Sequence, residues 1–130
     1  MSDRTLDDIL HAAGLSCDVR GVRDLSGGCI HRVVEVTLGD DVVVIKVGSR
    51  SASALFEEER VGLDRLAAAD VIPVPRPIAA VATSSASALV MTRIETCRAS
   101  DASWRRFGED LAALHGLDAG MRYGFDIDNH

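Results

Sequence analysis

The stretch Val42-Val43-Val44-Ile45-Lys46-Val47 decides the fold that we assign to this chain. Its residues other than lysine are all β-branched, which favours a strand that is buried on most sides. Lys46 interrupts this apolar run, and it is the only lysine of the chain, since the other basic residues are all Arg. Because an ammonium and a planar guanidinium are not interchangeable, we expect Lys46 to occupy a position that requires a compact cation. A strand lysine whose ammonium reaches solvent is the alternative.

The residues around this strand predict an α+β fold. The turn Gly39-Asp40-Asp41 connects it to the preceding strand, and the simplest arrangement of the first three strands is antiparallel. The predicted strands are 19–25, 32–38, 42–47, 78–82 and 88–94, and the predicted helices are 5–13, 53–69 and 103–117. These elements predict a five-stranded, mainly antiparallel sheet with one main packed helix, a leading helix and a trailing helix.

The helix predicted for residues 53–69 carries a carboxylate on its apolar side. At about 100° per residue, Glu59 falls within the stripe of apolar side chains, whereas Glu57 points away from it. That stripe consists of Leu55, Leu63 and Leu66. A carboxylate that faces a sheet is costly unless it is paired. Since Lys46 lies on the strand against which this helix must pack, the pattern predicts an ion pair between Lys46 and Glu59.

A glycine-containing loop, Ser26-Gly27-Gly28-Cys29-Ile30-His31, separates the first two strands. Glycines allow backbone N–H groups to approach a bound phosphate closely, which would make this a phosphate-binding loop. Taken alone, a Gly-Gly pair between strands more often indicates a plain hairpin. Cys29 lies among these N–H groups and beside His31, and this setting would favour a reactive thiolate.

Composition and charge exclude several classes of function. The chain has 130 residues and a net charge of −6, so it suits one compact domain and lacks the basic patch of a nucleic-acid-binding protein. No apolar run approaches the roughly 20 residues of a membrane-spanning helix, and the acidic N-terminus does not resemble a signal peptide. Three cysteines without metal-ligand spacing fit a reducing cytoplasm. We therefore expect a cytoplasmic protein that binds neither nucleic acid nor membrane.

Several segments, in the same order and with similar spacing, resemble the fructosamine (ketosamine) kinase family from about Asp18 onward. They are Gly27-Gly28-Cys29-Ile30, Val44-Ile45-Lys46-Val47, Phe56-Glu57-Glu58-Glu59 with Gly62, Leu63 and Leu66, Val74-Pro75-Arg76-Pro77, Phe107-Gly108 with Leu111, Ala112, Leu114 and His115, and Tyr123-Gly124-Phe125. The resemblance implies a protein-kinase-like fold of two lobes. It also implies a kinase that uses ATP and Mg²⁺ to phosphorylate ketosamines, carried by small molecules or proteins, in deglycation.

The resemblance implies a role for each matching residue. Lys46 would bind the α- and β-phosphates of ATP and pair with Glu59. The loop formed by Gly27, Gly28, Cys29 and Ile30 would cover the phosphates, and the loop cysteine would permit thiol-based redox control. Met91 would be the gatekeeper, followed by Thr92, Arg93 and Ile94 as a hinge beside the adenine ring. Thr92 stands where many relatives have Glu.

The resemblance divides the chain at residue 94. Residues 1–94 would form the N-terminal lobe, and residues 95–130 would form the hinge, the linker and the first helix of an incomplete C-terminal lobe. Residues 1–130 contain no His-x-Asp or Asp-Phe-Gly segment, so the catalytic base and the Mg²⁺ ligands are expected in a C-terminal lobe. We therefore expect this chain alone not to catalyse phosphoryl transfer.

Two other functions remain open at this stage. The first is a stand-alone nucleotide-binding or protein-interaction module without kinase activity, and the second is an α+β domain that does not bind nucleotides. The apolar face of the last predicted helix, with Phe107, Leu111 and Leu114, would need a partner, and a homodimer is one option.

Overall fold

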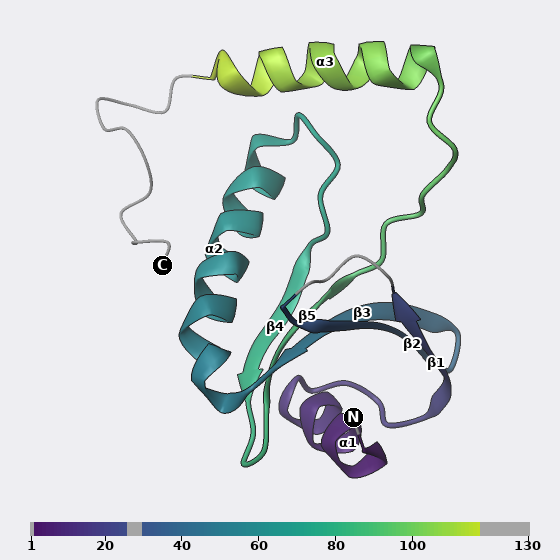
Figure 1. Ribbon diagram of the computed structural model, residues 1–130, viewed down its shortest axis with the longest axis vertical. Helices are drawn as coiled ribbons and strands as arrows, with labels where there is room; N and C mark the ends of the chain where they lie inside the picture. Colours follow the sequence, from purple (N-terminus) through teal and green to yellow (C-terminus); the bar gives the residue numbers. More distant parts are fainter. Residues whose placement is uncertain (1, 26–29, 118–130) are drawn as a thin grey trace.

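The computed structural model describes residues 2–25 and 30–117. Its elements in chain order are α1 (Asp3–Ala12), β1 (Val19–Leu25), β2 (Arg32–Leu38), β3 (Asp41–Gly48), a 3₁₀ turn (Arg50–Ala52), α2 (Ser53–Ala69), β4 (Pro77–Ala82), β5 (Ser87–Thr92) and α3 (Asp101–His115). Figure 1 shows their arrangement. The predicted bounds of β1, β2 and α2 are confirmed. Strand β5 ends two residues earlier than predicted, and α3 begins and ends two residues earlier.

The five strands form one sheet in the order β1-β2-β3-β5-β4. Every neighbouring pair is antiparallel, which confirms the predicted sheet. Strand β3 lies in the middle, where its β-branched residues are hydrogen-bonded on both sides. At this position Lys46 pairs in register with Val33 on β2 and with Leu89 on β5.

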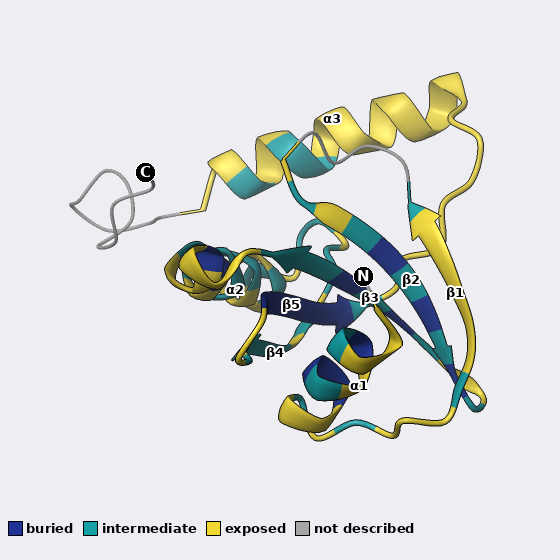
Figure 2. Cartoon of the chain, turned by 60° about the horizontal axis from the view of Figure 1, so that its bottom comes forward, coloured by how far each residue is buried: buried dark blue, intermediate teal, exposed yellow. Residues whose placement is uncertain are grey.

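The two faces of the sheet are covered by different helices (Figure 2). Because side chains alternate along a strand, Ile45 faces one side and Lys46 the other. On the side of Ile45, helix α1 buries Leu6, Ile9 and Leu10 in the larger hydrophobic cluster. Helix α1 was expected only as a leading helix, yet Ile9 and Leu10 are fully buried. It thus closes one side of the core.

Helix α2 packs on the other face, next to β4 and β5. Its anchor is Phe56, which is fully buried against Leu89 and Met91 of β5. Leu66 of the predicted stripe is instead 37% exposed, because the packed side of α2 follows Phe56 and Leu63. Residues at these spacings lie on one helical face, which also includes Glu59.

Helix α2 approaches the sheet closely at Gly48, the last residue of β3. A Cβ atom at Gly48 would lie 3.0 Å from the Cβ of Ala52, 3.0 Å from Nδ1 of His31 and 3.1 Å from Cζ of Phe56. The turn before α2 is held by the buried Ser87, whose Oγ donates to the carbonyl oxygen of Ser49 at 2.6 Å. The missing side chain of Gly48 therefore makes room for the start of α2.

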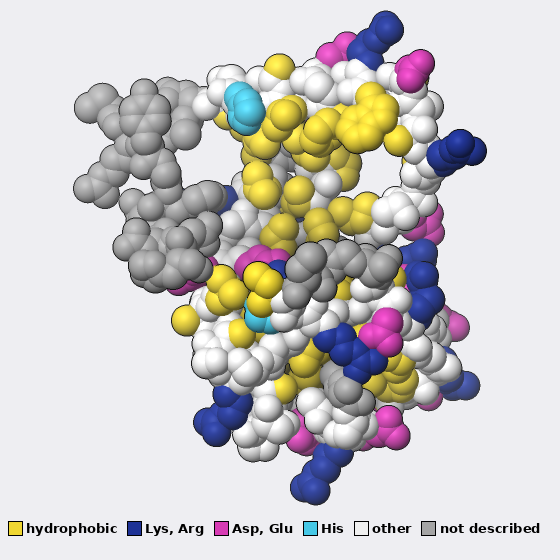
Figure 3. All heavy atoms as spheres, in the orientation of Figure 1, with side chains coloured by type: hydrophobic (Ala, Val, Ile, Leu, Met, Phe, Trp, Pro, Cys, Tyr) yellow, Lys and Arg dark blue, Asp and Glu magenta, His cyan; other side chains and the backbone are white. Residues whose placement is uncertain are grey.

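Helix α3 lies across one end of the molecule and has no buried residue (Figure 1). Its Ser100 cap and Ser103 form a capping box, which fixes where the helix begins. Trp104 and Phe107 are 64% and 46% exposed. Figure 3 shows hydrophobic side chains on the side of α3 that faces the rest of the molecule. Within residues 2–25 and 30–117, no helix is long and apolar enough to cross a membrane.

The packing at Gly48 can be tested with two glycine substitutions. We expect Gly48→Ala to lower the free energy of unfolding by about 1–3 kcal/mol, because the added methyl group overpacks the contact with α2. The control is Gly62→Ala in α2, where a Cβ would meet nothing within 4 Å. This variant is expected to raise the free energy of unfolding by about 0.5–1 kcal/mol. Urea denaturation measures both, and equal effects of the two substitutions would contradict the packing described.

Candidate functional site

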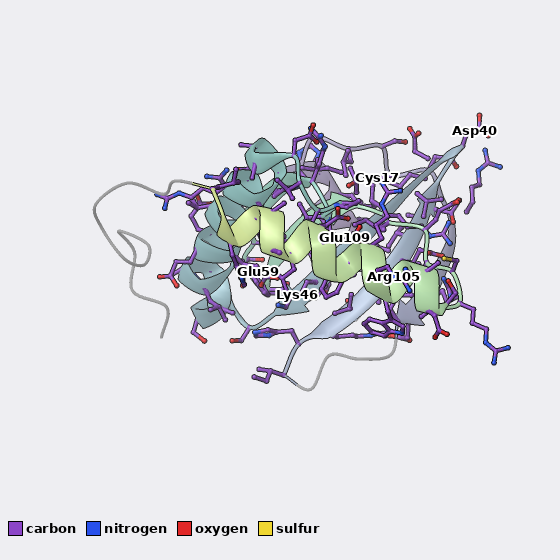
Figure 4. All side chains as sticks on the ribbon, turned by 90° about the horizontal axis from the view of Figure 1, so that it is seen from above. Cys17, Asp40, Lys46, Glu59, Arg105 and Glu109 are labelled. Atoms are coloured by element: carbon purple, nitrogen blue, oxygen red, sulfur yellow. The ribbon has the colours of Figure 1, made fainter. Side chains whose placement is uncertain are left out.

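The structure places an ion pair between β3 and α2. Nζ of Lys46 lies 2.6 Å from Oε2 of Glu59. The two side chains are 25% and 32% exposed, so the pair is shielded on most sides yet open to a ligand. Figure 4 shows Lys46 and Glu59 side by side beneath α3. The pair predicted from the apolar strand and the helical stripe is therefore present.

The aromatic ring of Phe56 supports this ion pair. Nζ of Lys46 lies 5.9 Å from the ring centroid, within the range of a cation–π contact. The imidazole of His31 meets the same ring edge-on, with the centroids 5.0 Å apart. Nε2 of His31 is buried and has no hydrogen-bond partner among the described residues. Phe56 thus links the end of the glycine-containing loop to the lysine.

Apolar side chains extend from Lys46 over β1 and β2. The strand register aligns Leu25 and Val33 with Lys46, and it aligns Val44 with Met91 in the next row. Leu25, Val33 and Val44 are half-buried, and Met91 is buried. Leu25, Val33 and Val44 were not singled out as site residues from the sequence. Val44 lies two residues before Lys46, which predicts the same face of the strand, but the register that aligns Leu25 and Val33 with Lys46 comes only from the paired strands.

A second group of charges lies in the row of Val44 and Met91. Oε1 of Glu35 on β2 accepts from Arg23 of β1, with Nη2 at 3.0 Å. The other oxygen, Oε2, lies 2.8 Å from Nε of Arg93, which follows β5. The side chain of Glu35 is only 14% exposed, so its charge is shielded and compensated from two sides.

The structure places the residues of the predicted hinge at the end of β5 and directly after it. Thr92 still belongs to β5, because its N–H donates to the carbonyl oxygen of Arg76 and its Oγ1 accepts from the N–H of Arg76. The backbone N–H of Thr92 is therefore paired with the segment that leads into β4, and the role of Thr92 in a hinge stays a prediction. Arg93 and Ile94 lie beyond the strand, and Ile94 is 38% exposed.

The phosphate-loop prediction falls mostly outside the described residues, which exclude Gly27, Gly28 and Cys29. Ile30 is described, and its side chain is 87% exposed. At the base of the loop, Arg32 donates two hydrogen bonds to the carboxylate of Asp24, at 2.6 and 2.9 Å. This bond to Arg32 lowers the pKa of Asp24 below its usual value and raises the pKa of Arg32. The pair joins the ends of β1 and β2.

No cluster of three or more His, Cys, Asp or Glu suited to a metal ion occurs within the part of the chain that the structure describes. A cavity of about 400 Å³ lies between the connection that follows α2 and helix α3, lined among others by Asp70, Arg76 and Arg106. Neither Lys46 nor Glu59 lines it. The candidate functional site is therefore not this cavity but the Lys46–Glu59 pair with the neighbouring apolar face.

This arrangement suits a ligand with an anionic group and a flat apolar part. A half-buried ammonium, fixed by a carboxylate, can hold an anion such as a phosphate. The apolar side chains beside it can cover a flat ring. A family model described as "Fructosamine kinase" matches residues 1–130.

The chain belongs to the fructosamine kinase family.

Two curated relatives agree with this family assignment. One, from Synechocystis sp. and named "Probable ketoamine kinase", is 35% identical over 107 residues, which cover 82% of this chain and 36% of the relative. Another protein of that name, from Vibrio parahaemolyticus, is 28% identical over 107 residues, which cover 82% of this chain and 37% of the relative. This fructosamine kinase family chain therefore spans little more than a third of either relative.

A crystal structure from Haemophilus somnus, described as "Putative fructosamine-3-kinase", has the same fold. The TM-score is 0.82 at 22% identity, and the match covers 95% of this chain and 42% of that one. At this level of identity the likeness shows the fold, and it confirms the predicted α+β class. The sheet on which Lys46 lies thus belongs to a fold that this chain shares with that structure.

The Lys46–Glu59 pair predicts energetic coupling between its members. In a double-mutant cycle with Lys46→Met and Glu59→Gln, we expect a coupling free energy of about 1 kcal/mol in urea denaturation. The control is the exposed pair of Arg20 and Asp18, whose atoms lie 2.8 Å apart. Its cycle should give less than about 0.5 kcal/mol. Equal coupling in the two cycles would show that partial burial adds nothing to the Lys46–Glu59 pair.

Proposed function

We propose that this chain forms the nucleotide-holding part of an ATP-dependent kinase that phosphorylates ketosamines. The observation that supports the proposal is the partly buried Lys46–Glu59 pair beside an apolar face, in a chain that belongs to the fructosamine kinase family. In this proposal, residues 1–94 are the N-terminal lobe and residues 95–130 begin the C-terminal lobe.

Each part of the site has a role in holding ATP. The ammonium of Lys46 binds the α- and β-phosphates, and Glu59 keeps that ammonium in position. Leu25, Val33 and Val44 cover the adenine ring from one side. Met91 is the gatekeeper at the back of the site. The loop that contains Gly27, Gly28, Cys29 and Ile30 covers the phosphates.

Phosphoryl transfer needs groups beyond those of this sheet. When bound, Mg²⁺ neutralises charge on the phosphates. Its ligands and the catalytic base belong to the C-terminal lobe in this proposal, because residues 1–130 contain no His-x-Asp or Asp-Phe-Gly segment. We therefore predict that this chain alone binds ATP weakly and does not transfer phosphate. The ketosamine acceptor, on a small molecule or a protein, would bind to the complete enzyme.

A second candidate function is a protein-interaction module without kinase activity. It is favoured by the exposed side chains of Trp104 and Phe107, which meet edge-on in α3 and leave an apolar face available to a partner or a second copy. A cytoplasmic location suits both functions, since Cys17 and Cys97 are free and exposed.

ATP binding tests the proposed function. We expect the 130-residue chain to bind ATP in calorimetric titration and Lys46→Ala to lower the affinity at least about tenfold, because a charge-assisted contact to phosphate is lost. The matched control is Arg4→Ala, which removes a positive charge from α1 on the opposite face of the sheet.

Two results would count against the proposal. Absence of ATP binding by the unaltered chain would leave the interaction module as the better account. Equal loss of affinity in Lys46→Ala and Arg4→Ala would show that ATP responds to overall charge rather than to the site. Far-UV circular dichroism of each variant checks that the fold is retained.

A further inference from the structure

Glu35 lies on the same face of the sheet as Lys46, and the proposed binding of phosphate by Lys46 gives this carboxylate no role. Its register partner on β3 is Val44, and Lys46 comes two residues later. At the rise of a strand, the two rows lie about 7 Å apart. Leu25 and Val33 share the row of Lys46, whereas Val44 shares the row of Glu35, so Glu35 borders the apolar patch of Leu25, Val33 and Val44.

Glu35 connects three segments that are far apart in the sequence. Arg23 of β1 donates to Oε1 from both Nε and Nη2, at 3.2 and 3.0 Å. Arg93 reaches Oε2 from the far side of β3, because β5 and β2 are each neighbours of β3 in the sheet. The carboxylate therefore holds β1, β2 and the residue that follows β5 together over the central strand.

The burial of Glu35 distinguishes the Arg23–Glu35–Arg93 bridge from an exposed ion pair. The side chain of Glu35 is 14% exposed, compared with 63% for Arg23 and 38% for Arg93. A shielded carboxylate that has lost most of its water depends strongly on its partners. Residues 93–100 lie outside helices and strands and are exposed, so the pair with Glu35 ties the beginning of that segment to the sheet.

We propose that Glu35, held by Arg23 and Arg93, closes the outer end of the base site and positions the Arg93–Ile94 segment at its edge. This inference rests on the proposed function and adds Arg23 and Glu35 to it. Lys46 then determines how tightly the phosphates are held, and the Arg23–Glu35–Arg93 bridge determines how tightly the base is held. Arg93 and Glu35 act as positioning residues rather than as catalytic residues.

The two halves of ATP separate these roles. Adenosine and tripolyphosphate are titrated separately into the 130-residue chain, and binding is followed through backbone amide signals in two-dimensional NMR. We expect Glu35→Gln and Arg93→Ala each to lower adenosine affinity about five- to tenfold and to leave tripolyphosphate affinity within about twofold. Lys46→Ala should show the opposite pattern.

Two further variants sharpen the comparison. Glu35 and Arg93 act together in this inference. The double variant Glu35→Gln/Arg93→Ala should therefore lower adenosine affinity by no more than about twofold beyond either single variant. Asp18→Asn is the control, since it breaks an exposed carboxylate–arginine pair at the start of the same hairpin and should change neither affinity. Arg93→Lys, which keeps the positive charge, should recover part of the adenosine affinity.

The possible results distinguish the inference from the proposed function. If adenosine affinity is unchanged in Glu35→Gln and Arg93→Ala, the bridge does not hold the base. If both ligands weaken by the same factor, the bridge has a general structural role and the inference is wrong. If the unaltered chain binds neither adenosine nor tripolyphosphate, the proposed function is wrong, and this inference is wrong with it.

Discussion

The ion pair between Lys46 and Glu59 is the constraint on which the rest of the site depends. A lysine in the middle of an apolar strand and a glutamate on the packed side of a helix are each unfavourable without a partner. Joined at 2.6 Å, they hold β3 and α2 in one relative position. That position requires α2 to approach the sheet closely, which Gly48 permits, and it requires the ring of Phe56 to lie beneath the ammonium.

The site extends from this pair across the sheet. The central place of β3 puts the lysine between the β1–β2 hairpin and β5. The same alternation that directs Lys46 to one face directs Ile45 to the core beneath α1. One strand therefore contributes both to the core beneath α1 and to the candidate site. The Arg23–Glu35–Arg93 bridge lies beside Val33 and Val44, at the border of the face on which we propose that a base binds.

The sequence predicted the structure correctly where the local pattern of apolar residues matches the residues that are buried. The β-branched run around Lys46 and the helical spacing of Glu59 predicted the sheet, the helix and their ion pair. Helix α2 was nevertheless predicted to pack through Leu66, because periodicity alone cannot choose between stripes that differ by a small rotation. The size of Phe56 decides that rotation. The Glu35 bridge could not be predicted, since it depends on register between strands and on a residue far away in the chain.

The most direct test uses the fact that Lys46 is the only lysine. Selective labelling of lysine with ¹⁵N at Nζ gives a single side-chain signal, which reports on the site without assignment. We expect this signal to move on titration with ATP, and to move in Glu59→Gln before any ligand is added. If ATP binds, as judged by other signals, and the Lys46 signal stays in place, the ammonium does not hold the phosphates and the account of the site is wrong.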